Sequence, residues 1–398
     1  MPAVFTSITI AYLAKARVLA TSVKRHAPEA TFYLCLSEPI PPFLEQGMRD
    51  GTEPFDQIIT DSDLGIDRHL GWMFEHEVVE ACTAVKAAAL VHLQELGEST
   101  VLYLDPDVLV LSDLAPLIAE LGERSIALTP HCPDAETELA AIEFNEISSL
   151  AHGVYNLGFF GVATDDEGQR FARWWWHRLY HYCQDDIPRG LFTDQRWIDL
   201  VPAQFERVAI LRDPQYNAAS WNVTQRVITG SVIDGFRVNG APLCFYHFSG
   251  ANSGVPEEMH ARLGVSSPSV LDLVAHYRSL CEAAGEAELS RSRWHYATYR
   301  DGTTITRAQR VLHRDDPALQ VRFPDPFEVG PGSYLAWMKD REGGLAGVEL
   351  AFSESPEALR EAARRLRNLE ATRAYRLYRS GSVLARPLRW LAGARRPR

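Results

Sequence analysis

Short apolar, β-branched runs alternate with longer stretches of helical spacing over residues 1–110. The pattern predicts strands at Ala3–Ile10, Thr31–Leu36, Phe55–Ile59 and Val101–Leu104, and helices at Leu13–Arg25 and Glu75–Leu96. Such alternation predicts an α/β fold with a mostly parallel central sheet and helices on both faces. Ligands of such sheets bind at the carboxyl ends of strands, so the residues after Val101–Leu104 are the first candidates for a site.

The remaining chain continues the pattern with more loops. Further strands are predicted at Val108–Leu111, Ser125–Thr129, Val154–Val162 and Leu243–Phe248, and further helices at Leu114–Leu121, Arg170–Tyr182 and Ser269–Glu282. We predict three parts: a first domain at residues 1–256, an accessory region packed on it at 257–345, and a basic amphipathic helical tail at 346–398.

Charge and cysteine content narrow the class of protein. The chain has 398 residues with 40 Lys and Arg against 52 Asp and Glu, a net charge of −12, whereas general nucleic-acid binders are usually basic. No apolar run approaches the length of a membrane span, and the first residues lack a basic leader and a cleavage site. The six cysteines are scattered without a CxxC pair. We therefore expect a reduced, cytoplasmic protein without a nucleic-acid partner.

The C-terminal stretch has the opposite charge. Residues 357–398 hold twelve Arg and three Glu, a net of +9, so the other 356 residues carry −12 − 9 = −21. Leu, Tyr and Trp lie between the arginines, and a basic amphipathic helix of this kind can lie on an anionic membrane surface. The alternative is a solvated helix that packs on the acidic part of the chain or on a partner.

Asp105-Pro106-Asp107 follows the predicted strand Val101–Leu104. Two carboxylates at i and i+2, placed in a turn at a strand end, can bind one divalent cation such as Mn²⁺ or Mg²⁺. Such a cation, also bound by two phosphates, stabilises a departing nucleoside diphosphate. The alternative is a solvated turn, since Asp and Pro are common turn residues.

His247 lies at the end of another predicted strand, in the sequence CFYHFSGAN. A neutral imidazole is a suitable third ligand for a cation that two carboxylates already bind. On its own the residue would be read as a histidine hydrogen-bonded within the core. The acidic pair at a separate strand end favours the ligand interpretation.

Other polar residues follow predicted strands or lie on neighbouring helices. Asn156 and the pair Asp194-Gln195 offer amide and carboxylate groups suited to sugar hydroxyls, although such residues also cap helices and close turns. Asp194 could be the N-cap of a helix that contains Trp197. Lys86 lies on the helix before Val101–Leu104, where it can extend to solvent or bind a phosphate.

The order of these motifs resembles a bacterial GT-A-fold glycosyltransferase and is similar to glycosyltransferase family 8. The resemblance covers roughly residues 3–339 and is carried by the segments AYLAKARVL, TAVK (Thr83–Lys86), YLDPD, NLG, DQ and HFSG. It also extends to bacterial glycosyltransferases of surface-polysaccharide biosynthesis through FYHFSGAN, YATYRDGTTITRAQR and FPDPF. The sequence departs from family 8 after HFSG, where ANSGVPEE lacks the lysine that the family places on the diphosphate.

The resemblance implies a GT-A (Rossmann-like) fold and a nucleotide-sugar donor, a UDP-sugar in preference to a GDP-sugar, with transfer to a glycan or lipid-linked acceptor. The implied metal ligands are Asp105, Asp107 and His247. The implied donor-binding residues are Tyr12, Lys86, Asp105, Asn156 and Gly250, and the implied catalytic residues are Asp194 and Gln195.

Two other functions fit part of the sequence. Asp105-x-Asp107 after an apolar strand also suits a haloacid-dehalogenase-type phosphatase, although that motif normally opens its domain and leaves His247 without a role. A non-catalytic protein that binds sugar nucleotides is the other alternative, because the expected lysine is missing.

Overall fold

The computed structural model describes residues 1–250 and 267–344, with side chains to Asp340 in the last helix. The described chain forms two compact units. The first contains Met1–His69 and Val78–Tyr296, and the second contains Leu70–Glu77 and the residues from Ala297 onward. The two predicted domain boundaries, at 256/257 and 345/346, both fall outside the described residues and stay predictions.

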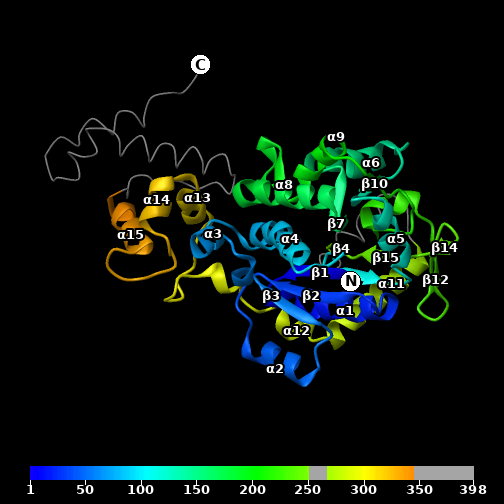
Figure 1. Ribbon diagram of the computed structural model, residues 1–398, viewed down its shortest axis with the longest axis horizontal. Coiled ribbons are helices and arrows are strands. Elements are labelled where there is room, and N and C mark those ends of the chain that lie inside the picture. The colour runs from blue at the N-terminus through cyan, green and yellow to red at the C-terminus, as the bar shows by residue number, and fades with distance from the viewer. Residues whose placement is uncertain (251–266, 345–398) are drawn as a thin grey trace, which may run out of the picture. The chain divides into compact units, whose positions relative to one another are not determined.

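A seven-stranded sheet forms the centre of the first unit, in the order β10-β6-β7-β4-β1-β2-β3 (Figure 1). Its strands are β1 (Pro2–Ile8), β2 (Thr31–Leu36), β3 (Gln57–Thr60), β4 (Thr100–Leu104), β6 (Ile126–Pro130), β7 (Tyr155–Ala163) and β10 (Val208–Ile210). All neighbouring pairs run parallel except those of β7, which is antiparallel to both β4 and β6. The predicted mostly parallel α/β sheet is thus confirmed.

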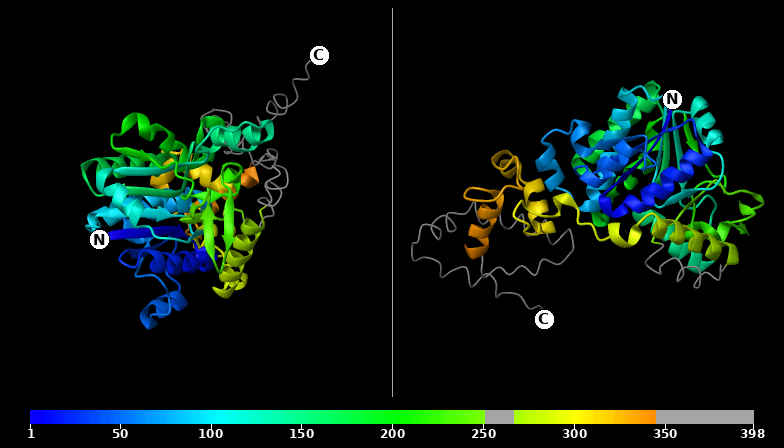
Figure 2. Two further views of the ribbon diagram at one scale, coloured as in Figure 1. Left: turned by 90° about the vertical axis from the view of Figure 1, so that its right-hand side faces the viewer. Right: turned by 90° about the horizontal axis from the view of Figure 1, so that it is seen from below.

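Helices cover both faces of this sheet (Figure 1, Figure 2). The main ones are α1 (Leu13–His26), α2 (Pro42–Asp50), α4 (Val78–Glu95), α5 (Ala115–Glu123) and α8 (Asp166–Tyr182). Because side chains alternate along a strand, Leu102 and Leu104 of β4 face the core that includes Leu19 of α1 and Leu121 of α5. Tyr103 faces the other way, toward α4 and toward α8 through Phe160. The near-continuous apolar sequence of β4 follows from this burial on both faces.

Three small sheets and several short helices complete the first unit. The sheets are β11-β15-β5 (Ala218–Ala219, Phe245–His247, Val108–Val110), β12-β13-β14 (Ile228–Ser231, Gly235–Val238, Ala241–Pro242) and β8-β9 (Gln184–Asp186, Leu191–Thr193). The helices are η1 (Ile10–Tyr12), η2 (Asp61–Leu64), α6 (Leu139–Ala141), η3 (Ile142–Ile147), α7 (Ser148–His152), η4 (Ile187–Arg189), η5 (Gln195–Leu200), α9 (Val201–Gln204), η6 (Ser220–Gln225), α11 (Pro268–Ala283) and α12 (Glu286–Leu289). The first of the small sheets positions part of the candidate site.

The second unit is helical and has its own aromatic core. Its described helices are most of α3 (His69–Phe74), α13 (Arg307–Asp315), α14 (Pro317–Arg322) and α15 (Tyr334–Gly344), and η7 (His295–Ala297) lies at the boundary with the first unit. Phe74 packs against Phe327 and Tyr334, with ring centroids 5.2 and 5.4 Å apart. These helices confirm the predicted C-terminal helical extension as far as residue 344; the basic tail lies outside the described residues.

One predicted helix is wrong at its start. The apolar spacing predicts a helix over Glu75–Leu96, whereas α4 begins at Val78 and residues 75–77 separate it from α3. Glu75–Glu77 belongs to the second unit, where Glu75 contacts His313. Tertiary contacts of this kind override local helix propensity.

Candidate active site

The register of the small sheet brings His247 next to the acidic turn. In β15 and β5, His247 is paired with Val108, the residue after Asp107, and the amide of Phe248 donates to the carbonyl of Asp107 at 2.8 Å. The amide of Asp105 in turn donates to the carbonyl of Gly158 at 2.9 Å, next to the last ladder pair of β4 and β7. Backbone pairing therefore fixes the position of both carboxylates and of the imidazole.

The side chains of Asp105, Asp107 and His247 converge. Nε2 of His247 lies 3.1 Å from Oδ1 of Asp107 and 3.7 Å from Oδ2 of Asp105. Each residue offers one ligand atom, and these atoms all lie within 4.8 Å of one another. Donor atoms about 2.1 Å from one ion are about 3 Å apart, so small movements would suffice for all three to bind the same cation.

Electrostatics within this group favour a charged imidazole of His247 beside a charged carboxylate of Asp107. Burial alone would lower the pKa of His247, but the carboxylates of Asp107 and Asp105 together outweigh it and the pKa is raised. Burial alone would raise the pKa of Asp107, but His247 outweighs it and the pKa is lowered. Asp105, Asp107 and His247 would hold a divalent cation with the imidazole deprotonated, because a ligating histidine must be neutral.

Gly158 leaves room for the imidazole. A Cβ built on Gly158 would lie 2.3 Å from Cε1 and 2.4 Å from Nδ1 of His247, and 2.8 Å from Oδ1 of Asn156. Nδ1 of His247 is buried and has no hydrogen-bond partner among the described residues. The glycine of the NLG motif thus makes a cradle for the ring whose Nε2 faces the carboxylates.

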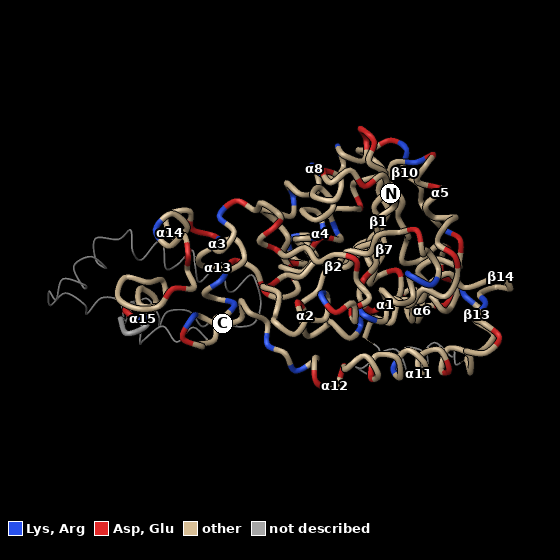
Figure 3. The backbone as a smooth tube through the Cα atoms, turned by 60° about the horizontal axis from the view of Figure 1, so that its bottom comes forward, with Lys and Arg blue, Asp and Glu red and all other residues tan. Residues whose placement is uncertain are grey.

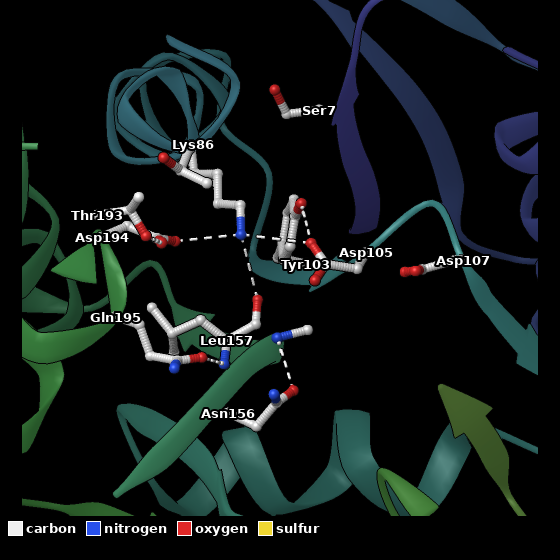
Figure 4. Close-up of polar contacts among 12 residues, drawn as sticks. Ser7, Lys86, Tyr103, Asp105, Asp107, Asn156, Leu157, Thr193, Asp194 and Gln195 are labelled. Atoms are coloured by element: carbon white, nitrogen blue, oxygen red, sulfur yellow. Dashed lines mark hydrogen bonds and ion pairs between the residues drawn. The ribbon is translucent and has the colours of Figure 1, made fainter. Parts of the chain in front are cut away.

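Lys86 is buried between two carboxylates and does not extend to solvent (Figure 4). Its Nζ lies 3.1 Å from Oδ2 of Asp194 and 3.3 Å from Oδ1 of Asp105, and it donates to the carbonyl of Leu157 at 3.3 Å. Burial lowers the pKa of Lys86, but Asp105 and Asp194 more than reverse this, so the ammonium stays charged. Asp105 therefore joins the candidate metal site to a buried ion pair.

Asp194 occupies the N-cap position of η5, but its side chain does not cap that helix. Its carboxylate binds Lys86 and accepts from the Thr193 hydroxyl at 3.0 Å. Thr193 has a φ of +45°, a left-handed conformation that is costly for a β-branched residue. The local backbone is thus held in an unfavourable conformation that places Asp194 beside Lys86.

Gln195 and Asn156 use their amide groups within the protein. Gln195 accepts from the amide of Leu157 and donates to the carbonyl of His152, both at 3.0 Å. Oδ1 of Asn156 accepts from Gly158 and from Asn217, both at 2.9 Å. These contacts shape β7 at the site, and contact of either side chain with a sugar stays a prediction.

The remaining predicted residues lie at strand ends of the first unit. Tyr12 is 46% exposed after the carboxyl end of β1, with Nζ of Lys15 4.7 Å from its ring centroid. Gly250, three residues beyond β15, has a φ of +69°, which suits glycine. Their predicted roles in donor binding stay predictions.

Sequence reasoning missed three residues that support the site. The hydroxyl of Tyr103 donates to Asp105 at 2.6 Å, a contact that the i, i+2 spacing at the end of β4 could have suggested. Asn217 and His131 both hydrogen-bond to the Asn156 amide. His131 and Asn217 come from distant segments, and no local pattern connects them to Asn156.

The sequence predicts neither a disulfide framework nor a membrane span. All six cysteines are described and none is in a disulfide. Among the described residues, no helix is long and apolar enough to cross a membrane.

Figure 3 shows Asp and Glu interspersed with Lys and Arg along the described chain.

Curated relatives share part of the sequence. No family model matches the chain. It is 32% identical over 154 residues to the uncharacterized protein YfnF of Bacillus subtilis (strain 168), which covers 38% of this chain and 49% of the relative. It is 27% identical over 175 residues to the uncharacterized protein YfnD of the same strain, which covers 43% and 53%. The chain thus spans about half the length of the curated relatives that it matches.

Solved structures with low similarity are named as glycosyltransferases. They include the galactosyltransferase LgtC in complex with donor and acceptor sugar analogs (17% identity, 70% of this chain and 100% of that chain, TM-score 0.39) and GlyE of Streptococcus pneumoniae TIGR4 (15%, 75% and 66%, TM-score 0.40). Mouse xyloside xylosyltransferase 1 is a third (15%, 62% and 97%, TM-score 0.38). At these identities and TM-scores, the likenesses do not assign an activity to this chain.

Proposed function

We propose that this protein is a metal-dependent glycosyltransferase of GT-A fold that transfers a sugar from a UDP- or GDP-sugar to a hydroxyl of a glycan or lipid-linked acceptor. The convergence of Asp105, Asp107 and His247 from two separate strand ends is the observation that carries the proposal. Carboxylate oxygens with one imidazole nitrogen form a donor set suited to Mn²⁺ and also acceptable to Mg²⁺. The motif resemblance to family 8 supports the same reaction class.

The residues present fit such a cation. The two carboxylates supply the negative charge, and the Gly158 cradle admits the His247 ring beside them. A bound divalent cation would neutralise the charge that develops on the nucleoside diphosphate leaving group. Asp105, Asp107 and His247 would hold that cation where β4 and β15 end, the edge at which α/β sheets bind ligands.

The buried ion pairs of Lys86 with Asp105 and Asp194 have a proposed role besides metal binding. Lys86 holds Asp105 and Asp194 in fixed positions, so no reorganisation is needed when substrate binds. We place Asp194 and Gln195 next to the transferred sugar, with Asp194 as the acidic group and Gln195 fixing the backbone of Leu157. Tyr12, Asn156 and Gly250 complete the proposed donor site.

Turnover of isotope-labelled UDP- and GDP-sugars with Mn²⁺ tests this proposal. Transfer or slow hydrolysis of the donor is expected for the wild-type protein, and Asp107→Asn is expected to lower the rate by roughly a hundredfold or more because it removes a charged ligand of a cation worth several kcal/mol to the transition state. Gly122→Ala is a matched control on an exposed helix position with open space around it. Cleavage of phosphate esters instead would support the phosphatase alternative. Donor binding without turnover would support the non-catalytic one.

Contact of the protein with the inner face of the cytoplasmic membrane through its basic tail is part of the proposal. A lipid-linked acceptor of surface polysaccharide would lie there, and twelve arginines in residues 357–398 suit an anionic surface. Sedimentation with anionic vesicles should retain the full chain and not a chain ending at Pro356. Equal retention of both would remove the tail from the proposal.

A further inference from the structure

The two oxygens of Asp105 have different surroundings. Oδ1 accepts from the Tyr103 hydroxyl at 2.6 Å and lies 3.3 Å from Nζ of Lys86. Oδ2 lies 3.7 Å from Nε2 of His247. A free aspartate side chain rotates broadly about its last torsion and exchanges its oxygens. In this site two donors contact Oδ1, whereas Oδ2 faces the candidate metal ligand His247.

The position of the Tyr103 hydroxyl is set by packing of its ring. The side chain is 1% exposed and stacks on Phe160, with centroids 5.1 Å apart and planes at 10°. Phe5 contacts its edge at 4.9 Å, and Nζ of Lys86 lies 4.3 Å from its centroid. These contacts hold the ring whether or not the hydroxyl is present.

Strand geometry directs this hydroxyl at Asp105. Tyr103 is in β4, and Asp105 follows that strand with spacing i, i+2, so both side chains leave the backbone on the same side. A 2.6 Å O–H···O contact has the length of a hydrogen bond to an ionised carboxylate, which is stronger than one between neutral groups. The hydroxyl therefore contributes to the orientation of the carboxylate as well as to its charge balance.

We propose that Tyr103 is a positioning residue of the metal site: its hydroxyl, together with Lys86, occupies Oδ1 of Asp105 and so presents Oδ2 to the cation. The inference rests on the proposed metal-dependent function. Groups that orient a metal ligand typically change metal affinity 10–100-fold when they are removed.

Mn²⁺ binding to Tyr103→Phe, measured from the free-ion EPR signal, tests the inference without any substrate. The substitution keeps the ring, its stacking and its contact with Lys86, and removes only the hydroxyl. The dissociation constant for Mn²⁺ should rise about tenfold. Turnover should recover at saturating Mn²⁺, which a general structural defect would not allow.

Tyr33→Phe is a matched control in the same sheet. Tyr33 lies in β2, is 3% exposed and donates its hydroxyl to the carboxylate of Glu98 at 2.7 Å. Glu98 precedes β4, so this contact lies at the end of the sheet opposite to Asp105. Tyr33→Phe should destabilise the protein by a similar amount and leave Mn²⁺ affinity unchanged.

The outcomes separate the inference from the proposed function. A wild-type protein that binds no Mn²⁺ overturns the metal-dependent function itself. A wild-type protein that binds Mn²⁺ while folded Tyr103→Phe binds it equally well overturns only the role of Tyr103. Equal loss of affinity in Tyr33→Phe would show a general effect of lost stability and would also overturn it. Should Tyr103→Phe not fold, Lys86→Arg provides a second measurement, because displacing the other donor to Oδ1 should also weaken Mn²⁺ binding, and unchanged affinity would contradict the inference.

Discussion

Among the described residues, the histidine–carboxylate contacts of His313 and His247 differ in how completely their polar atoms are used. In the second unit, Nδ1 of His313 lies 3.1 Å from Oε1 of Glu75, and Nε2 lies 3.1 Å from the carbonyl oxygen of Phe323. The His313 side chain is 0% exposed and the Glu75 side chain 5%. Both ring nitrogens have partners, and the contact is closed to solvent.

The contact in the first unit is open at one side. His247 directs Nε2 to two carboxylates, while its Nδ1 has no hydrogen-bond partner among the described residues. The side chains of Asp105 and Asp107 are 25% and 15% exposed. A closed pair of this type serves the fold, whereas converging donors that still reach the surface can bind a ligand. The same residue types therefore indicate function only through their surroundings.

The largest expected effect comes from replacing Lys86, the buried ammonium group that contacts Asp105. Asp105, Asp107 and His247 form the open cluster. Lys86→Met would leave Asp105 and Asp194 without their common partner, and removal of one member of a buried ion pair typically costs about 3–5 kcal/mol. Urea denaturation of wild type and variant measures the difference. A loss below about 1 kcal/mol would mean that solvent already screens the pair.

A substitution in the closed contact of His313 with Glu75 should lower the stability of the protein and leave its Mn²⁺ affinity unchanged. His313→Phe removes the hydrogen bonds to Glu75 and to the Phe323 carbonyl, with an expected loss of about 2–3 kcal/mol in the free energy of unfolding. Mn²⁺ affinity should not change in the folded variant. A clear loss of Mn²⁺ binding under conditions where it is fully folded would contradict the contrast between the two clusters.

Gly158→Ala tests the space that the open cluster requires. The new methyl group would overlap the His247 ring, and overpacking of this kind costs about 1–3 kcal/mol. Because the ring must move, Mn²⁺ binding measured by EPR should weaken along with stability. Gly122→Ala, where nothing lies within 4 Å, should do neither. Unchanged Mn²⁺ affinity in Gly158→Ala would show that His247 is not held at the carboxylates by this cradle.

The effect that is smallest at neutral pH, and grows only in acid, concerns a histidine next to the open cluster. Burial lowers the pKa of His131 to about 4, and its Nε2 accepts from the amide of Asn156 at 3.0 Å. The unfolded chain protonates this group near pH 6.5, so its contribution to stability is complete above that pH and is lost as pH falls toward 4.

His131→Gln should remove this contribution. Between pH 6.5 and 4 the wild-type protein should lose about 1 kcal/mol per pH unit more than the variant. Chemical denaturation at several pH values measures both slopes. Parallel slopes would show that His131 does not stay neutral in the folded protein.

Much of the fold and part of the site follow from local patterns. The apolar run Thr31–Leu36 is a strand with those bounds, and Leu13–Arg25 differs from α1 by one residue. Asp105 and Asp107 are recognisable because a strongly apolar strand ends next to them. The start of α4 could not be predicted from a local pattern. Glu75 fits the helical spacing, but its partner His313 lies 238 residues away.

The sequence by itself determined the alternation of strands and helices and the residue types able to bind a cation, because periodicity and strand ends are local properties. The tertiary structure decided which of these residues meet. The β5–β15 register puts His247 beside Asp107, burial turns Lys86 into a partner of two carboxylates, and side-chain alternation points Tyr103 at one oxygen of Asp105. Distances between segments far apart in the chain are set by sheet pairing and packing, which no local pattern encodes.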